Sequence, residues 1–190
     1  MVKAILGPMY SGKSTELFRY AERAVRAKKD VLLIRPNIDN RGYFSHSSGT
    51  EVLFNNISIP VIYESDLSNY DIRQFNDIDM LFIDEFFMIK GVNLLLERLK
   101  RSCNIEIYLA GLISTSENVT FEQVSLCLPY CDDIIKLNAV CSVCGSDLGN
   151  HTFYKAGVKD SSQSIVVGGD QEYDARCYQC YCVGEHQKSS

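Results

Sequence analysis

The first stretch with an evident chemistry is an octapeptide near the N-terminus, Gly7-Pro8-Met9-Tyr10-Ser11-Gly12-Lys13-Ser14. It has the pattern G-x-x-x-x-G-K-S, in which glycines let the backbone curl so that its N–H groups surround phosphate oxygens. The lysine of this pattern reaches the β- and γ-phosphates, and the final hydroxyl can bind Mg²⁺. The octapeptide and the adjoining Thr15 are therefore candidates for binding ATP and its Mg²⁺ ion.

The residues on either side of the octapeptide fit this interpretation. Val2–Leu6 is a short, mostly apolar run that favours a β-strand, and residues 13–27 favour a helix with one apolar face. A loop between the end of a strand and the start of a helix presents free N–H groups and the helix dipole to an anion. This context disfavours the alternative, an ordinary glycine turn beside an exposed lysine.

A second chemical candidate is the acidic pair Asp84-Glu85, which directly follows the apolar run 80–83. A carboxylate at the end of such a strand can hold Mg²⁺ through its water shell, opposite the hydroxyl of Ser14. The adjacent Glu85 should point elsewhere, and it could act as the general base toward an acceptor hydroxyl. The alternative is a surface acidic pair at the entry to a helix, which the phosphate loop makes less favoured.

Four cysteines form two C-x₂-C pairs, Cys141 with Cys144 and Cys177 with Cys180. Two such pairs can place four sulfurs tetrahedrally around Zn²⁺, and four thiolates leave no open position, so the metal would be structural. Cys182 could replace Cys180, although the spacing favours Cys180. Between the pairs lie 32 residues, more than is usual in a zinc ribbon, so this insert should have a function of its own. Buried cysteines without a metal are the alternative.

Apolar runs that alternate with helical patterns should position these groups. The pattern predicts strands at 2–6, 31–34, 52–54, 57–62, 80–83, 105–110 and 134–137, and helices at 13–27, from 66, at 92–101 and at 121–128. This alternation, without tight hairpins, indicates an α/β fold with a parallel sheet. Ligands of such sheets bind at the carboxyl ends of the strands. The phosphate loop, Asp39, Arg41, the acidic pair and the loop after Ala110 should converge there.

From about Ala139 the glycine and cysteine content rises and the helical periodicity ends. We therefore predict a nucleotide-binding domain at residues 1–138 and a small zinc-binding lobe at 139–190, in which 183–190 form a tail. The insert between the cysteine pairs carries an apolar run from Ser164 that ends in Gly168-Gly169, followed by Tyr173. Bare backbone amides of this kind could read a planar base while the aromatic ring packs on the sugar or the base.

Composition excludes some classes of protein. The chain has 190 residues with 19 basic and 24 acidic side chains, a net charge of −5, which argues against a broad nucleic-acid-binding surface. No apolar run approaches the length of a membrane span. The N-terminus enters the first predicted strand at once, which leaves no room for a signal peptide and favours the cytoplasm. An Asn-Lys-x-Asp stretch that would read guanine is absent, so a GTPase is disfavoured.

Together these motifs resemble the thymidine kinases of the cytosolic vertebrate, poxviral and bacterial type. The shared segments are Gly7–Leu17, Asp39–Arg41, Ile83–Glu85, Lys136–Cys141 and Val167–Cys180, in the family's order. The resemblance implies transfer of the ATP γ-phosphoryl group to the 5′-hydroxyl of thymidine or deoxyuridine. It also implies a RecA-like parallel sheet with helices on both faces and a zinc-anchored lasso that closes over the nucleoside.

The resemblance further assigns roles to individual residues. Glu85 would accept the proton, Lys13, Ser14 and Asp84 would form the phosphate and Mg²⁺ set, and Asp39 and Arg41 would lie on the phosphate side. The implied nucleoside pocket comprises Met9, Leu112, Phe121, Ser164, Ile165, Val166, Val167, Gly168 and Tyr173. A homotetramer and inhibition by the end product dTTP are also implied.

Two departures from the family pattern fall in the implied nucleoside pocket. The family follows its Asp-Glu pair with x-Gln-Phe, whereas this chain has Phe86-Phe87-Met88, so either phenylalanine could supply the stacking ring. The family also places an aspartate and an aromatic residue after Gly-Leu, and Ser116 stands at the aromatic position here. Two alternatives therefore stay open: a deoxynucleoside kinase of relaxed specificity, and a zinc-ribbon ATP-dependent nucleic-acid-binding module, which the negative charge opposes.

Overall fold

The computed structural model describes residues 1–37, 50–102, 104–155 and 172–188. The chain divides into two units. The first consists of Met1–Ile5, Ser14–Gly111 and Glu122–Ile135, and the second of Leu6–Lys13, Leu112–Phe121 and Lys136–Ser190.

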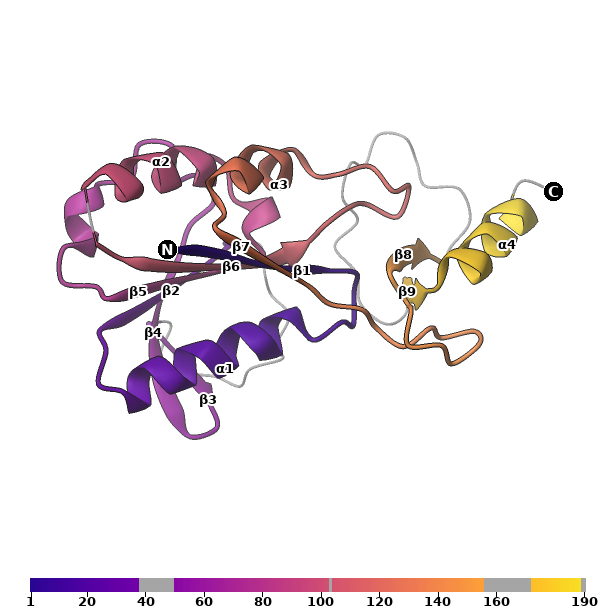
Figure 1. Ribbon diagram of the computed structural model, residues 1–190, viewed down its shortest axis with the longest axis horizontal. Helices are drawn as coiled ribbons and strands as arrows, with labels where there is room; N and C mark the ends of the chain where they lie inside the picture. The colour runs from indigo at the N-terminus through magenta and orange to yellow at the C-terminus, as the bar shows by residue number, and fades with distance from the viewer. Residues whose placement is uncertain (38–49, 103, 156–171, 189–190) are drawn as a thin grey trace. The chain divides into compact units, whose positions relative to one another are not determined.

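The main sheet of the described residues has seven strands in the order β3-β4-β2-β5-β6-β1-β7 (Figure 1). Their bounds are β1 Val2–Gly7, β2 Val31–Arg35, β3 Glu51–Phe54, β4 Ile57–Tyr63, β5 Met80–Asp84, β6 Glu106–Leu112 and β7 Asp133–Lys136. Strand β2 runs parallel to β4 and β5, and β5 runs parallel to β6. The predicted α/β class with a mostly parallel sheet is confirmed.

Strand register brings the polar strand ends to one edge of the sheet. Ile34 pairs with Ile83, and Asp84 pairs with Ala110. The apolar residues that precede these ends are fully buried, as expected for central parallel strands covered on both faces. Because register is fixed by this burial, Arg35 at the end of β2 and Asp84 at the end of β5 must lie at the same edge.

Strands β3 and β4 form a tight antiparallel hairpin, so the prediction of a sheet without hairpins is wrong. The turn consists of Asn55 and Asn56, whose φ angles are 48° and 62°. A two-residue hairpin of this kind requires left-handed backbone at both positions, and asparagine tolerates that conformation better than most residues. Both strands lie at the predicted positions. The prediction did not include a hairpin turn at Asn55-Asn56.

Three helices cover the sheet within the first unit. Helix α1 (Lys13–Arg26) lies on one face, and α2 (Val92–Ser102) and α3 (Glu122–Cys127) lie on the other, as Figure 1 shows. The buried residues of α2 recur at helical spacing and include Val92, Leu95, Leu96 and Leu99. Each helix buries its apolar face against the sheet, and this burial fixes the orientation of the helix on the sheet.

The predicted helix starting near Asp66 is wrong. A carboxylate oxygen of Asp66 accepts the backbone N–H of Ser68 at 2.8 Å, a local bond that competes with helix formation. The segment instead pairs with Lys90, and a Cβ atom on Gly91 would come within 2.5 Å of the Ser68 nitrogen. The helical turn begins later, as a short 3₁₀ helix at Ile72–Phe75.

The second unit contains a small antiparallel hairpin, β8 (His151–Tyr154) with β9 (Tyr173–Arg176), and helix α4 (Tyr178–Lys188). The prediction of a tail from residue 183 is wrong, since α4 runs through it. In α4, a Cβ on Gly184 would meet the guanidinium group of Arg176 and come within 2.7 Å of the Phe153 ring. A helix that packs through a glycine lacks a regular apolar stripe, which is why the sequence pattern did not indicate it.

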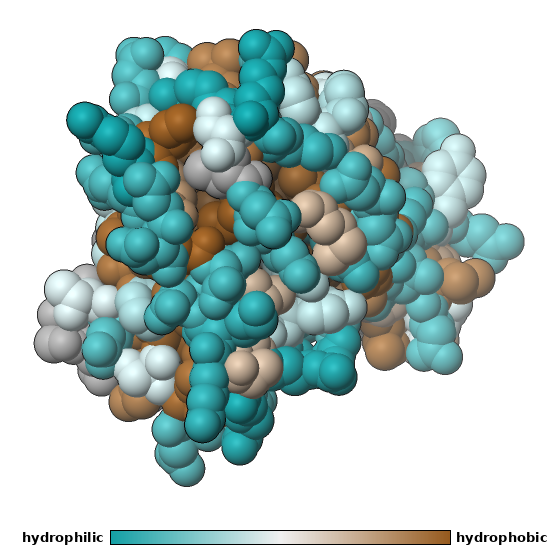
Figure 2. Space-filling model, turned by 60° about the vertical axis from the view of Figure 1, so that its left-hand side comes forward, coloured by the Kyte–Doolittle hydropathy of each residue, from teal (hydrophilic) through white to brown (hydrophobic). Residues whose placement is uncertain are grey.

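Polar and charged side chains dominate the face in Figure 2, with smaller apolar areas between them. Exposed apolar side chains occur on different elements, among them Leu94 on α2, Val119 in the loop after β6 and Tyr178 on α4. Scattered exposure of this kind is ordinary for a folded protein. Among the described residues, no helix is long and apolar enough to cross a membrane.

Candidate active site

The predicted phosphate loop lies between the end of β1 at Gly7 and the start of α1 at Lys13. A Cβ atom on Gly7 would come within 2.5 Å of the Ser11 hydroxyl oxygen and 2.7 Å of the Leu137 carbonyl oxygen, so only glycine fits there. Gly12 has a φ of 78°, a conformation that glycine adopts without strain. Ser11 donates its hydroxyl to the Pro8 carbonyl at 2.9 Å. The backbone therefore makes the tight curl that a phosphate cradle needs.

Lys13 is held against the loop's own backbone. Its ammonium group donates to the Pro8 carbonyl at 2.6 Å, and only 7% of the residue is exposed. A buried ammonium group attracts an anion more strongly than one in water, because the surrounding dielectric is lower. The ammonium group is therefore held at the phosphate loop, and its contact with the β- and γ-phosphates stays a prediction.

The hydroxyl of Ser14 and the carboxylate of Asp84 meet within the first unit. Ser14 donates to Asp84 Oδ1 at 2.9 Å, and Asp84 is 1% exposed. Both groups offer the oxygen ligands that Mg²⁺ prefers, so the pair matches the predicted Mg²⁺ set.

Arg35 lies beside Asp84 and is not among the residues predicted for the site. Its Nε lies 3.6 Å from Asp84 Oδ2, and its side chain is 8% exposed. The guanidinium group and the carboxylate therefore bring opposite charges together at the ends of β2 and β5. The available signal was a polar residue at the end of an apolar strand, the same signal that identified Asp84.

Glu85 occupies an uncommon backbone conformation, with φ 51° and ψ 40°. It follows β5 directly and is 9% exposed. Left-handed backbone at a residue other than glycine or asparagine costs free energy and concentrates at functional sites. The chain therefore turns sharply after Asp84, as expected if neighbouring carboxylates are to serve different atoms.

The two phenylalanines after the acidic pair are both buried. Phe86 is 1% exposed and Phe87 is 8% exposed. A Cβ atom on Gly111 would come within 3.1 Å of both rings, so the rings pack closely on the end of β6. Either ring stays a prediction for the stacking role, and Phe87 is the less buried of the two.

Residues predicted for the nucleoside pocket occur in the second unit next to the phosphate loop. Met9 donates its backbone N–H to the hydroxyl of Thr152 on β8 at 3.1 Å, and Tyr10 donates its hydroxyl to the Tyr173 carbonyl on β9 at 3.3 Å. Thr152 was not predicted, and it belongs to no motif of the sequence. The predicted residues that lie outside the described ranges are Asp39, Arg41, Ser164, Ile165, Val166, Val167 and Gly168.

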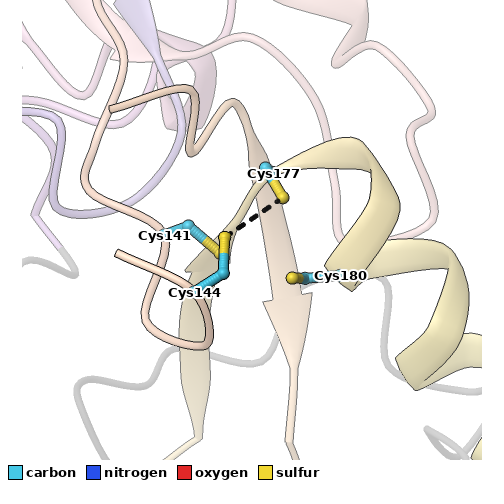
Figure 3. Close-up of side chains that lie close together, drawn as sticks. All are labelled: Cys141, Cys144, Cys177 and Cys180. Atoms are coloured by element: carbon cyan, nitrogen blue, oxygen red, sulfur yellow. Dashed lines mark hydrogen bonds between the residues drawn. The ribbon is translucent and has the colours of Figure 1, made fainter. Parts of the chain in front are cut away.

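The four predicted metal ligands come together. The sulfurs of Cys141, Cys144, Cys177 and Cys180 all lie within 4.8 Å of one another, and Figure 3 shows them directed toward a common centre. The sulfurs of Cys144 and Cys177 are 3.7 Å apart. A tetrahedral Zn²⁺ site with bonds of about 2.3 Å places its sulfurs about 3.8 Å apart, so these residues fit zinc. Cys182 is not part of this cluster.

Local hydrogen bonding prepares one of these sulfurs to bind a cation. Burial raises the pKa of Cys141, but the backbone N–H groups of Cys144, Cys177 and Val143 donate to its sulfur and bring the pKa down to about 6. Hydrogen bonding to the Cys177 sulfur, with burial, raises the pKa of Cys180 to about 12. The pKa values of Cys141 and Cys180 therefore lie on opposite sides of the usual thiol value, and a divalent cation binds thiolates in preference to thiols.

Comparison with known proteins agrees with this arrangement. The family model described as thymidine kinase matches residues 1–181. A curated thymidine kinase from Pseudothermotoga lettingae (strain ATCC BAA-301 / DSM 14385 / NBRC 107922 / TMO) is 36% identical over 185 residues, which cover 93% of this chain and 92% of that protein. The resemblance seen in the sequence motifs is confirmed. The chain belongs to the thymidine kinase family, a family of ATP-dependent kinases that phosphorylate thymidine.

Proposed function

We propose that this chain transfers the γ-phosphoryl group of ATP to the 5′-hydroxyl of thymidine or deoxyuridine. With thymidine as the acceptor, the products are thymidine monophosphate and ADP. The observation that carries the proposal is the 2.9 Å hydrogen bond between Ser14 at the end of the phosphate loop and Asp84 at the end of β5. It joins the two elements that a phosphate-loop kinase uses to hold the metal-bound triphosphate.

In this proposal Gly7 to Thr15 bind the phosphates of ATP through backbone N–H groups and the Lys13 ammonium group. Ser14 and Asp84 hold Mg²⁺, which neutralises charge on the phosphate oxygens. Asp39 and Arg41 are proposed to act on the phosphate side of the site. The buried position of Lys13 supports this assignment, because its charge is screened from water.

Glu85 is the proposed general base. As the 5′-oxygen forms its bond to the γ-phosphorus, the bond from that phosphorus to the bridging oxygen of ADP breaks, and the hydroxyl proton passes to Glu85. Support comes from the left-handed backbone of Glu85, directly after Asp84. This sharp turn lets the two neighbouring carboxylates leave the end of the strand in different directions. Catalysis is then mostly a matter of position and charge, with little covalent chemistry for the protein.

The nucleoside is proposed to bind between Met9 and Tyr173, with Leu112, Phe121 and residues 164–168 completing its pocket. Supporting this, Met9 and Tyr10 of the phosphate loop are hydrogen-bonded to β8 and β9 respectively. An acceptor held by this hairpin would therefore lie close to the phosphates. Phe86 or Phe87 is proposed to stack on the base.

The cysteine cluster is proposed to hold a structural Zn²⁺ ion that ties together the base of the insert within the lobe at 139–190, and residues 1–138 are proposed to form the nucleotide-binding domain. Four thiolate ligands leave no position for a reacting water molecule, which supports a structural role. Reduced thiolates persist in a reducing compartment, which supports a cytoplasmic location. A homotetramer inhibited by dTTP completes the proposal, by analogy with the family.

The metal assignment predicts that the purified chain contains about one zinc ion, and that Cys177→Ser loses it. The lobe then loosens, and the KM for thymidine rises. Elemental analysis together with steady-state kinetics measures both effects. Cys182→Ser is the matched control and should keep the metal, because Cys182 lies outside the cluster. Wild-type protein without metal would refute the structural role.

Substrate specificity is tested by turnover on thymidine, deoxyuridine, deoxycytidine and deoxyguanosine with ATP and Mg²⁺. We expect kcat/KM for thymidine and deoxyuridine to exceed the others by about 10²-fold or more, as a pocket that hydrogen-bonds one base edge should discriminate. Similar values for all four would favour the deoxynucleoside kinase of relaxed specificity, which the departures at Phe87, Met88 and Ser116 motivate. Retention on single-stranded DNA without phosphorylation would favour the nucleic-acid-binding module.

A further inference from the structure

The loop between β6 and α3 forms a compact turn in the second unit. Thr115 donates its backbone N–H to the Val119 carbonyl at 2.8 Å, and Asn118 donates to the Thr115 carbonyl at 3.1 Å. Asn118 has a φ of 60°, which closes the turn. Residues 113–121, which we call the β6–α3 loop, include Val119, 62% exposed, and Ser116, 6% exposed. The part of the loop that carries Ser116 is therefore packed against other residues, whereas the part that carries Val119 faces solvent.

Tyr181 of α4 provides one anchor. Its hydroxyl donates to the Ser116 carbonyl at 2.5 Å, and the residue is 7% exposed. Its backbone N–H donates to the Cys177 carbonyl at 2.9 Å, and it directly follows Cys180. Two cysteines of the cluster thus determine where Tyr181 lies.

His151 of β8 provides the second anchor. A 2.7 Å hydrogen bond joins its Nδ1 to Asn118 Oδ1, and because an amide oxygen only accepts, His151 is the donor. The His151 ring also packs on Tyr181, with ring centroids 5.1 Å apart. His151 pairs with Arg176, the residue before Cys177. Both anchors therefore come from backbone that is adjacent to the cysteine cluster.

We propose that Tyr181 and His151 are positioning residues that fix the β6–α3 loop to the cysteine cluster and so set the affinity for the nucleoside. The effect on affinity follows because Leu112 and Phe121, assigned above to the nucleoside pocket, stand immediately before and at the end of this loop. The proposal rests on the proposed function for that pocket, whereas the link between loop and cluster stands on the hydrogen bonds alone. Neither side chain is proposed to contact the reacting atoms.

The kinetic test uses variants that remove one hydrogen bond each. Tyr181→Phe keeps the ring and removes the donor, and Asn118→Gly keeps the left-handed backbone and removes the acceptor. Each should raise the KM for thymidine by about tenfold while kcat and the KM for ATP stay within about twofold. Tyr63→Phe, on an exposed tyrosine of β4, is the matched control and should change none of these.

A double-mutant cycle isolates the His151 bond. His151→Phe keeps an aromatic ring beside Tyr181, and its effect should not add to that of Asn118→Gly, because either change alone removes the same bond. Fully additive effects, or equal changes in both KM values, would overturn the positioning role.

A second measurement does not depend on activity. Hydrogen exchange at the Thr115 and Asn118 amides should speed up in Tyr181→Phe, and zinc chelation should speed it up in the wild type but add little in the variant. Unchanged exchange after chelation would overturn the link to the cluster. Should the wild type phosphorylate no nucleoside, the proposed function and the affinity effect both fail, while the exchange result still decides whether the link exists.

Discussion

Glu85→Gln should lower kcat for thymidine phosphorylation by about 10² to 10⁴-fold, the usual contribution of a general base. Glutamine keeps the size of the side chain and can still accept a hydrogen bond, but it cannot take the proton from the 5′-hydroxyl. Because Glu85 leaves the strand through left-handed backbone after Asp84, ATP affinity should stay within about twofold. Steady-state kinetics and calorimetric ATP binding measure the two quantities separately.

Glu122→Gln is the matched control for this experiment. Glu122 is exposed at the start of α3, so the same chemical change there should leave kcat and the melting temperature unaltered. A Glu85→Gln protein that melts normally and turns over at the wild-type rate would show that Glu85 is not the base. A loss of ATP binding instead would assign Glu85 to the metal-bound triphosphate.

Lys13→Met should lower kcat/KM for ATP by about 10² to 10³-fold, the cost of removing one preorganised charge from the transition state. The ammonium group is almost completely buried and is held by the Pro8 carbonyl, so no neighbouring water can replace it at the same place. Methionine preserves much of the aliphatic stem, and thymidine binding should therefore persist. Kinetics at varied ATP, with thymidine binding measured by calorimetry, provide the readout.

Lys28→Met is the control here, since Lys28 is exposed after the end of α1. It changes the net charge by the same amount without touching the phosphate loop. Equal losses in both variants would mean that overall charge, and not the position of Lys13, controls ATP use.

The sheet was predictable because its central strands are continuous apolar runs that end in polar residues. Burial on both faces determines both their position and their register, as in β5, where Asp84 follows the apolar run directly. The errors arose where local polar groups decide the structure. Asp66 forms its own turn instead of capping a helix, two asparagines close a hairpin, and α4 packs through Gly184 without an apolar stripe.

The candidate site was predictable to the extent that its chemistry lies in short motifs. The octapeptide, the acidic pair and each of the two C-x₂-C pairs span only a few neighbouring residues, and the structure brings Ser14 to Asp84 and the four sulfurs together. Thr152 and Tyr181 belong to no motif, and their partners are 143 and 65 residues away along the chain, whereas Arg35 carries the strand-end signal that also marks Asp84. One sequence does not indicate contacts at such separations, since each depends on how the strands pair and pack.

The sheet order also has a consequence for how the chain folds during synthesis. Strand β1, which is synthesised before the other strands of this sheet, lies between β6 and β7, which end at Leu112 and Lys136. Its backbone groups find their strand partners only after most of the chain has been made, and pairing at such long range is slow. Until then the apolar strand that precedes the phosphate loop is exposed to other chains. We therefore expect truncation before residue 133 to leave β1 unpaired on one edge and the product prone to aggregate.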